Sequence, residues 1–153
     1  MPHQDEFNHS RSLTVRRLLE QSFTLSELDD TQHYFARDFR LHAPLFPVLP
    51  ARPSAWTTAI RFFLTGLCDV KLIFGCGCVE NERVALSFVV EGMHTGPFGQ
   101  LAATHRAIRV SGLSLWRFDG PVIAEAWLEF GLFGALLPLE VFELVNSVSV
   151  LEN

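Results

Sequence analysis

The sequence has few cysteines and almost no lysine. Its 153 residues include three cysteines, and Lys71 is the only lysine, so Schiff-base chemistry would depend on one residue. An odd number of cysteines without a secretory context does not support a disulfide framework. We therefore expect Cys68, Cys76 and Cys78 to be reduced and to act as small buried hydrophobic residues. No second pair of Cys or His stands near Cys76 and Cys78 at ligand spacing, so the sequence predicts no metal site.

Basic clusters and long apolar runs are also missing. The formal net charge is −5, which argues against nucleic acid as a partner. The longest wholly apolar or glycine run covers residues 130–138, which is too short to cross a bilayer. Asp5 and Glu6 lie near the start, where the apolar core of a signal peptide is absent. We therefore expect a cytoplasmic protein without nucleic acid or membrane partners.

Apolar residues, in contrast, are abundant. They make up 48% of the chain, which includes 14 phenylalanines. Such a composition fits a large internal cavity, a buried face between subunits, or both. We expect a flexible N-terminus over residues 1–10 and one domain over residues 11–153. A homodimer or higher homo-oligomer would cover convex sheet faces that carry Leu86 and Phe88, or the apolar stretch 130–137.

Three helical segments are predicted in the first half of the chain. Residues 12–21 form the first, and the sequence TLSE at residues 24–27 has the pattern of a capping box that starts a second helix reaching about residue 37. The third covers residues 54–67, where apolar residues including Trp56 and Phe63 recur at the spacing of one buried face. Core packing explains that face without any ligand.

Strands fill most of the second half. Alternating and β-branched residues, separated by turns at residues 80–82 and 119–120, predict hairpin-linked strands, after a short extended segment at residues 39–43. These strands cover residues 70–79, 83–93, 108–118 and 122–130. Helices followed by a run of strands predict an α+β fold, with a curved antiparallel sheet wrapped on three helices. Such a sheet leaves a deep pocket along its concave face.

Three segments of the chain carry a family resemblance. Residues 91–99 read EGMHTGPFG, residues 103–110 read ATHRAIRV, and residues 117–127 read RFDGPVIAEAW. Together they resemble the SnoaL-like polyketide cyclases of the nuclear transport factor 2-like superfamily, which carry G-x-H-x-G-x-(F/Y), A-T-G-(R/K) and R-F-x-D-G-x-I-x-E-x-W. The resemblance implies a cone-shaped fold over roughly residues 33–139. It also implies a cofactor-free ring closure of a polyketide ester by acid/base catalysis.

The last strand holds both a candidate acid and a departure from the family. Strict alternation places Ile123, Glu125, Trp127 and Glu129 on one face. Spacing alone favours a solvated acidic face with Trp127 as a packing platform. The resemblance implies a catalytic aspartate four residues after this tryptophan, where the chain has Gly131. Because glycine cannot move a proton, the acid has moved, the chemistry has changed, or catalysis is lost.

Four further polar residues match family positions. His42 lies where a histidine commonly lines the pocket mouth, although it could equally be a partly buried loop histidine. His94 is the histidine of the G-x-H-x-G turn, and a structural role is favoured over a catalytic one. His105 replaces a family glycine, so it is either a surface residue or a local change of specificity. Arg117 is either a donor to a substrate oxygen or part of a structural ion pair.

The leading interpretation is a cofactor-free enzyme that moves protons on a hydrophobic, carbonyl-bearing small molecule such as a polyketide. His42 and Glu129 are the candidate proton carriers, and Arg117 is the candidate oxyanion donor. The candidate substrate-binding residues are Trp127, His94, Trp56, Phe63 and His105. Isomerisation or hydration in the same cavity is a second enzymatic option. The alternative is a binding or assembly protein without catalysis, which Gly131 favours.

Overall fold

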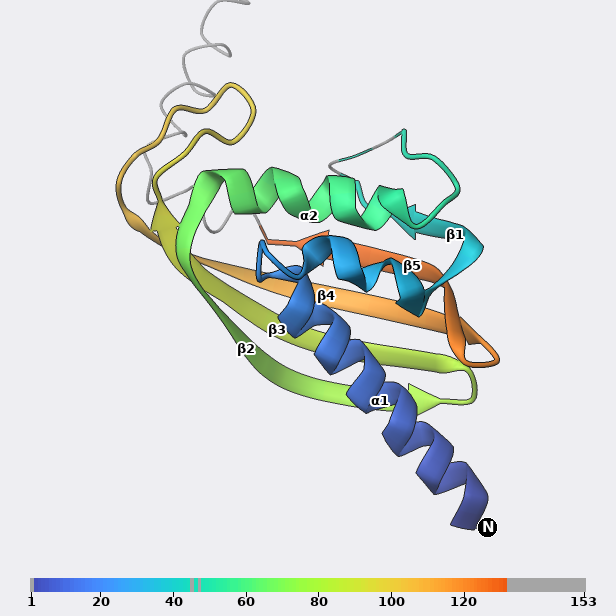
Figure 1. Cartoon of the computed structure of the whole chain (residues 1–153). Coiled ribbons are helices and arrows are strands. Elements are labelled where there is room, and N and C mark those ends of the chain that lie inside the picture. Colours follow the sequence, from blue (N-terminus) through green and yellow to red (C-terminus); the bar gives the residue numbers. More distant parts are fainter. Residues whose placement is uncertain (1, 45, 47, 132–153) are drawn as a thin grey trace, which may run out of the picture.

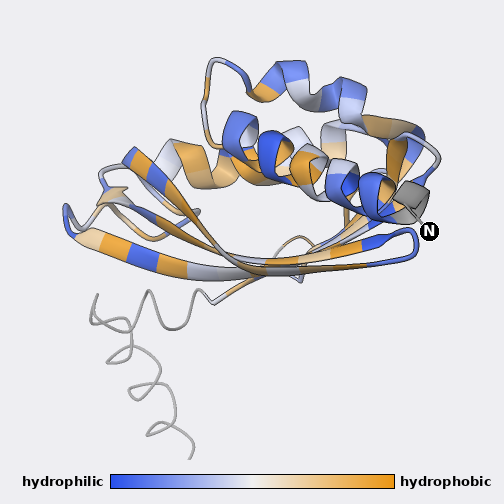
Figure 2. Ribbon diagram, turned by 90° about the horizontal axis from the view of Figure 1, so that it is seen from below, coloured by the Kyte–Doolittle hydropathy of each residue, from blue (hydrophilic) through white to orange (hydrophobic). Residues whose placement is uncertain are grey.

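A curved sheet covered on one face by helices makes up the protein (Figure 1). The computed structural model describes residues 2–44, 46 and 48–131. The helical layer consists of α1 (Pro2–Ser22), the 3₁₀ helix η1 (Leu28–Tyr34) and α2 (Ser54–Gly66), all on the same side of the sheet (Figure 2). The strands are β1 (Phe35–His42), β2 (Leu67–Glu80), β3 (Arg83–His94), β4 (Ala107–Asp119) and β5 (Val122–Phe130). The predicted α+β class and the three helical segments are confirmed.

The sheet is mixed rather than wholly antiparallel. Its strand order is β1-β5-β4-β3-β2, with antiparallel pairing throughout except between β1 and β5, which run parallel. Strands β2 to β5 follow one another through short turns or one longer connection, which makes their antiparallel pairing predictable from local sequence. Strand β1 reaches β5 only after α2 and three further strands. No hairpin constrains its direction, and the prediction of a purely antiparallel sheet is therefore wrong.

The N-terminal half departs from the predicted helix boundaries. Helix α1 starts at Pro2, so the segment predicted as a polar tail is helical, while its flexibility stays a prediction. The predicted capping box does not form, because Thr24 Oγ1 donates instead to the carbonyl of Glu20 at 3.2 Å, near the end of α1. The second helix is accordingly a 3₁₀ segment that ends at Tyr34, and strand β1 begins at Phe35, earlier than expected.

The core lies between the helices and the inner face of the sheet. Trp56 is fully buried, donates its Nε1–H to Ser22 Oγ at 2.8 Å and lies 5.1 Å from the Trp116 ring. The predicted buried face of α2 is thereby confirmed. Leu86 and Phe88 also point inward, with exposed fractions of 2% and 1%. They cannot form the convex apolar patch expected from the sequence, and residues 132–137 of the other expected patch lie outside the described residues.

A β-bulge in β5 breaks the alternation that the sequence predicts. Phe118 pairs with Ile123, whereas Arg117 pairs with Glu125, so β5 has one extra residue, Ala124, at this point. Ile123 consequently faces the core, as do Ala126 and Leu128 further along the strand. The prediction that Ile123 shares a face with Glu125 is wrong, whereas Glu125, Trp127 and Glu129 do share the outer face.

The outer face of the sheet carries exposed apolar side chains. Leu113 is 64% exposed and Ile73 is 42% exposed. The three cysteines are exposed too, which contradicts the prediction that they are buried. Strand β2, which holds them, is an edge strand with register shifts, and α1 reaches only part of its inner side. Hydrophobic composition alone could not show which strand lies at the edge.

Replacing Phe63 tests the core of α2. This side chain is 3% exposed and its ring centroid lies 4.4 Å from that of Phe130. We expect Phe63→Ala to lower the free energy of unfolding by about 3–5 kcal/mol, because it leaves an apolar cavity. Denaturant titration measures this change, with Phe7→Ala on α1, where the ring is 65% exposed, as the matched control. A loss below about 1 kcal/mol for Phe63→Ala would contradict the assigned packing.

Candidate functional site

The end of β1 and the middle of β5 meet on the outer face of the sheet. Their parallel pairing places His42 opposite Trp127 and Arg40 opposite Glu125. The imidazole of His42 stacks on Trp127, with ring centroids 5.0 Å apart and planes inclined by 14°. The neighbours Leu41 and Ala126 face the core, which fixes His42 and Trp127 on the side away from the helices.

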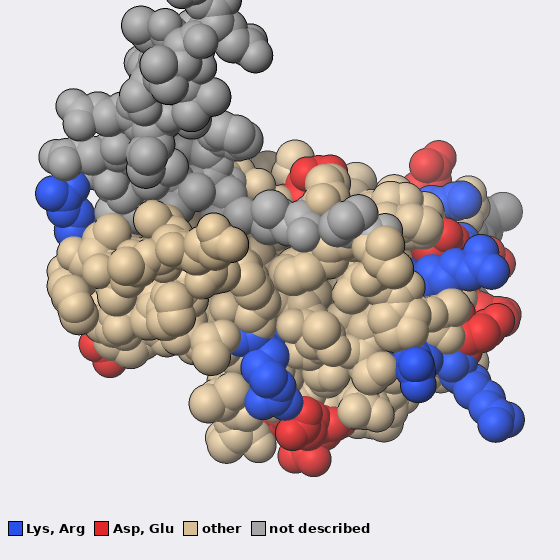
Figure 3. Space-filling model, turned by 90° about the horizontal axis from the view of Figure 1, so that it is seen from above, with Lys and Arg blue, Asp and Glu red and all other residues tan. Residues whose placement is uncertain are grey.

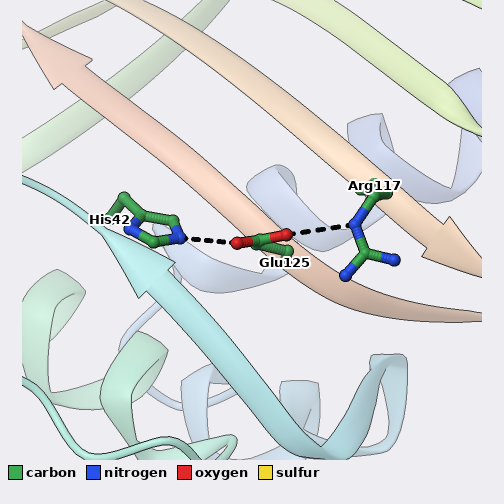
Figure 4. Close-up of polar contacts among 3 residues, drawn as sticks. All are labelled: His42, Arg117 and Glu125. Atoms are coloured by element: carbon green, nitrogen blue, oxygen red, sulfur yellow. Dashed lines mark hydrogen bonds and ion pairs between the residues drawn. The ribbon is translucent and has the colours of Figure 1, made fainter.

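Three charged or titratable side chains form a hydrogen-bonded array across this face (Figure 4). His42 Nε2 lies 2.7 Å from Glu125 Oε1, and Arg117 Nε donates to Glu125 Oε2 at 3.0 Å. The side chain of Glu125 is 20% exposed, whereas those of His42 and Arg117 are 47% and 34% exposed. One carboxylate is thus held between two nitrogen donors, with each of its oxygens occupied.

The contacts of the array favour the ionised form of Glu125. The hydrogen bond from His42 is the main cause that lowers the pKa of Glu125, the hydrogen bond and charge of Arg117 act in the same direction, and burial opposes them. An ionised carboxylate only accepts hydrogen bonds, so Nε2 of His42 must be the protonated nitrogen. In the neutral imidazole, Nδ1 then carries the free lone pair and is able to accept a proton.

An open pocket of about 690 Å³ adjoins His42. A hollow of this size is in the usual range for small-molecule sites. It lies between β1, β5 and the connection from β1 to α2, and it combines an aromatic wall with polar groups at its edge. Its described lining includes Arg40, His42, Phe46, Leu49, Trp127 and Glu129. The geometry therefore places a candidate proton acceptor beside a space large enough for an organic substrate.

Four of the predicted site residues come together here. His42, Trp127 and Glu129 line the pocket, and Arg117 reaches the array through Glu125. Arg117 directs its Nε to a protein carboxylate, as its structural-ion-pair alternative expects. Glu125 is the residue that sequence reasoning missed as a candidate. The available signal was its place on the same face as Trp127, but its partners lie on two other strands and could not be deduced from spacing.

The remaining predicted residues lie elsewhere. Trp56 and Phe63 are packed in the core, at 0% and 3% exposure. His94 is fully buried at the end of β3, and its Nδ1 lies 2.9 Å from Thr104 Oγ1. His105 is exposed at the base of the β3–β4 connection with a left-handed φ of 55°, which explains why a glycine would also suit this position. None of these four residues contacts the array in the described structure.

Gly131 lies at the end of β5 on the outer strand face. Its N–H donates to the carbonyl of Ser111 at 2.7 Å, and a Cβ added to it would lie 2.7 Å from Ser111 Oγ. Its φ is not in the left-handed region, so the backbone itself accepts a side chain. Introducing an acid here requires only that the serine hydroxyl moves.

The space between helices and sheet is largely filled by side chains. A cavity lined by aromatic and aliphatic residues remains there, with a volume of about 10 Å³, close to the minimum for a single water molecule. The buried polar residues of the sheet strands are His94 and Ser114. In the described part of the chain, the deep concave pocket expected from the sequence is therefore reduced to this remnant, and no carboxylate is buried beside it.

Metal clusters and membrane-spanning helices are both absent from the described residues. No cluster of three or more His, Cys, Asp or Glu side chains has an arrangement that could hold a metal ion. Among the same residues, none of the helices has the length and apolar character needed to cross a membrane.

Comparison with known protein families shows which family the chain belongs to. The sequence profile of the SnoaL-like polyketide cyclases matches residues 13–137. The chain belongs to the SnoaL-like polyketide cyclase family. The family resemblance inferred from the motifs is thus confirmed. No curated protein matches the chain at a significant level.

Solved structures share the fold of this SnoaL-like chain. AclR from Streptomyces galilaeus has a TM-score of 0.73 and 17% identity, over 86% of this chain and 96% of its own. IdmH from Streptomyces antibioticus has a TM-score of 0.72 and 22% identity, over 85% of this chain and 98% of its own. TsrD from Streptomyces laurentii has a TM-score of 0.69 and 19% identity, over 84% of this chain and 96% of its own. At these identities the comparison establishes the fold.

The array makes a pH-dependent contribution to the stability of this SnoaL-like protein. Because the pKa of Glu125 is lowered by folding, its contribution is fully present above the ordinary carboxyl pKa and is lost as the pH falls through the folded value. We expect the Tm difference between wild type and Glu125→Gln to shrink as the pH falls below about 4. Thermal unfolding from about pH 7 to pH 3 measures it.

Glu129→Gln provides the matched control for that experiment. Glu129 lies four residues further along the same strand face, and its side chain makes no hydrogen bond or ion pair within the described part of the chain. Its Tm profile shows how much of the pH dependence follows from losing any carboxylate on this face, and the excess for Glu125→Gln measures the contacts with His42 and Arg117. Equal pH profiles for the two variants would show that His42 and Arg117 do not hold Glu125 in solution.

Proposed function

We propose that this protein catalyses proton transfer on a hydrophobic, carbonyl-bearing small molecule, such as a polyketide ester, in the pocket beside His42. The observation that carries the proposal is the array in which Glu125, fixed by Arg117, holds Nε2 of His42 and leaves Nδ1 as a base. Membership of a polyketide cyclase family supports a small organic substrate. Because the exposed thiols fit a reducing compartment, we also place the protein in the cytoplasm.

The proposed reaction is an intramolecular aldol closure. His42 Nδ1 removes a proton from the carbon next to a carbonyl group, and the electron pair of the broken C–H bond forms an enolate. The negative charge of Glu125 stabilises the resulting imidazolium. The enolate carbon attacks a second carbonyl of the same molecule, and His42 returns its proton to the new alkoxide oxygen. Atoms and protons balance without any cofactor.

Other pocket residues assist in this scheme. Trp127 forms a flat wall that holds His42 by stacking and offers its ring to an aromatic or conjugated substrate. Arg40 lines the same pocket and supplies a cation for the enolate oxygen. The sequence suggested Arg117 as the oxyanion donor. Because Arg117 contacts Glu125, we assign this role to Arg40 instead. Glu129, on the rim, remains a second proton carrier.

Substitutions in the array test the proposed enzyme. With aromatic polyketide esters and small ketones as substrates, we expect His42→Gln to lower kcat by about 10²-fold or more, because the base is removed. Glu125→Gln should cause a comparable loss, since an amide does not stabilise an imidazolium. Glu27→Gln, an exposed carboxylate on the helical side, is the control. Full activity of both array variants would exclude this mechanism and leave Glu129→Gln as the next test.

A binding protein without catalysis is the second candidate. Gly131 at the position of the family's acid favours it, as does the apolar inner face of the sheet. Gly131→Asp, combined with Ser111→Ala to remove the close Oγ contact, places a carboxylate there. If wild type binds carbonyl compounds without turnover, and neither this double variant nor wild type closes a ring, the binding function is the better assignment.

We further propose that the protein is a homodimer joined through the outer face of the sheet. Exposed Leu113 and Ile73 lie among apolar hollows on β2, β3 and β4, and soluble monomers rarely leave such a patch uncovered. Static light scattering at micromolar concentration should give the mass of a dimer. Leu113→Arg should give a monomer, because it places a charge at the centre of the contact. Leu25→Arg, at a site with 59% exposure away from the sheet, should remain dimeric.

A further inference from the structure

One row of paired residues crosses every strand of the sheet on its outer face. The row begins at His42 on β1, which pairs with Trp127 on β5. Trp127 pairs in turn with Leu115 on β4. Leu115 pairs with Ala85 on β3, and Ala85 pairs with Cys78 on the edge strand β2. Because directly paired residues point to the same face of a sheet, these side chains form one continuous row.

Between the histidine and the thiol, this row is apolar and hollowed. Trp127, Leu115 and Ala85 are half-buried, whereas Cys78 is exposed. A hollow of about 510 Å³ lies along the row and is lined by its members from Trp127 to Cys78. Trp127 also lines the pocket beside His42, so the two hollows adjoin at its ring. An apolar track, defined by Trp127, Leu115, Ala85 and Cys78, thus leads from the candidate base to the edge of the sheet.

The neighbouring rows border the track on both sides. One of them consists of charged residues, which pair in the order Glu80, Arg83, Arg117 and Glu125. An apolar chain avoids this row, because covering a charge without a partner costs free energy. On the other side Leu113, which is 64% exposed, pairs with Glu129 and forms a ridge. In the proposed homodimer the second copy rests on Leu113 and Ile73, and therefore forms a side wall of the track.

The dimensions of the track set the length of chain that it accepts. Neighbouring strands lie about 4.8 Å apart, so the distance across the sheet from His42 to Cys78 is roughly 19 Å. An extended chain advances about 1.2 Å per bond, so roughly 15 bonds cover this distance. A compact ring system, in contrast, would occupy only the pocket beside His42.

The opposite wall of that pocket bears on the head of the substrate. The connection from β1 to α2 forms this wall, and its residues 43–51 include no charged residue. The face of the molecule that carries α2 and this connection is largely uncharged as well (Figure 3). The wall therefore favours a neutral head group over a carboxylate or phosphate.

We propose that the track is the tail site of the His42 pocket, and that the substrate is an extended, neutral 3-oxoacyl compound. Its activated carbon, between two carbonyl groups, lies beside His42, and its alkyl chain follows the track toward Cys78. The proposal rests on the proposed function, because the base at His42 fixes which end of the chain carries the carbonyl groups. It adds the length and the shape of the substrate.

Two neutral amides of different chain length test the track. The N-methylamides of 3-oxooctanoic acid and 3-oxohexadecanoic acid share a head group and lack a second ketone for ring closure. Equilibrium dialysis below their solubility limits gives each dissociation constant. Because the chain is half-buried, we expect each added CH₂ group to tighten binding by about twofold. Equal dissociation constants for the two amides would overturn the proposal.

Cys78 reports whether the chain reaches the far end of the track. At saturation the long amide should slow alkylation of Cys78 by iodoacetamide about tenfold, because a covered thiol is not attacked, and the short amide should not. Cys68, at the other end of β2, is the internal reference, and cleavage after Lys71 places it on a separate tryptic peptide. Equal protection of both cysteines, or protection of neither, would contradict the proposal.

A bulky residue in the middle of the track should close it. We expect Ala85→Trp to remove the preference for the long amide and the protection of Cys78, while binding of the short amide is unchanged. Val89→Trp, four residues further along the same strand face and outside the track, is the matched control and should keep the preference. Ala85→Phe replaces Ala85→Trp if circular dichroism shows that the tryptophan variant is unfolded. A preference that survives in the folded Ala85 variant would overturn the proposal.

His42→Gln separates the track from the proposed function. This variant should lose turnover of ring-closing substrates and keep the preference for the long amide, since the tail contacts other strands. Wild type that prefers the long amide but turns over no carbonyl substrate would support the track and contradict the catalytic role of His42. Wild type that turns over substrate but binds the two amides equally would contradict the track alone.

Discussion

The extra residue Ala124 in β5 determines which side chains reach each face of the sheet. Before the bulge Ile123 points into the core, and after it Ala126 and Leu128 do. A strand without this insertion would keep strict alternation, so that either Ile123 would turn to solvent or the acidic residues would turn inward. With the bulge, the apolar residues on both sides of it are buried, and Glu125 still lies on the outer face opposite Arg117. The whole array depends on this local change of register.

The two faces of the sheet consequently have different chemistry. Toward the helices, the strands present apolar residues with Ser114 and His94 as the buried polar exceptions, and aromatic rings fill most of the space. Away from the helices lie the His42–Glu125–Arg117 array and an open pocket. Among the described residues no carboxylate lines the small cavity between helices and sheet, whose lining is apolar. The proposed proton transfer accordingly uses the groups of the outer face.

Sequence alone predicts the parts of this fold that depend on local patterns. Helix α2 and the hairpin strands follow from three-four or alternating spacing and from turn residues, and their observed bounds lie within three residues of those expected. Contacts between distant segments escaped prediction. Strand β1 pairs with β5, which lies some eighty residues further along the chain. Strand β2 lies at the edge of the sheet. Thr24 donates a hydrogen bond back to α1 instead of capping a new helix. Part of the array could be named from sequence because His42, Trp127 and Arg117 belong to recognisable motifs. Glu125 joins them only through tertiary pairing, which spacing does not show.

The position of Arg117 decides which member of the array can hold a proton. In a pair of His42 and Glu125 alone, a proton taken up at the imidazole could be shared with the carboxylate through their hydrogen bond. Arg117 occupies the second oxygen of Glu125 and favours its ionised form, so the carboxylate becomes a weaker base. In the proposed reaction the proton taken from the substrate is therefore carried by His42, which lines the pocket, and is returned from there to a substrate oxygen. In that reaction the part of Arg117 is to keep Glu125 charged, without contact with the reacting molecule itself.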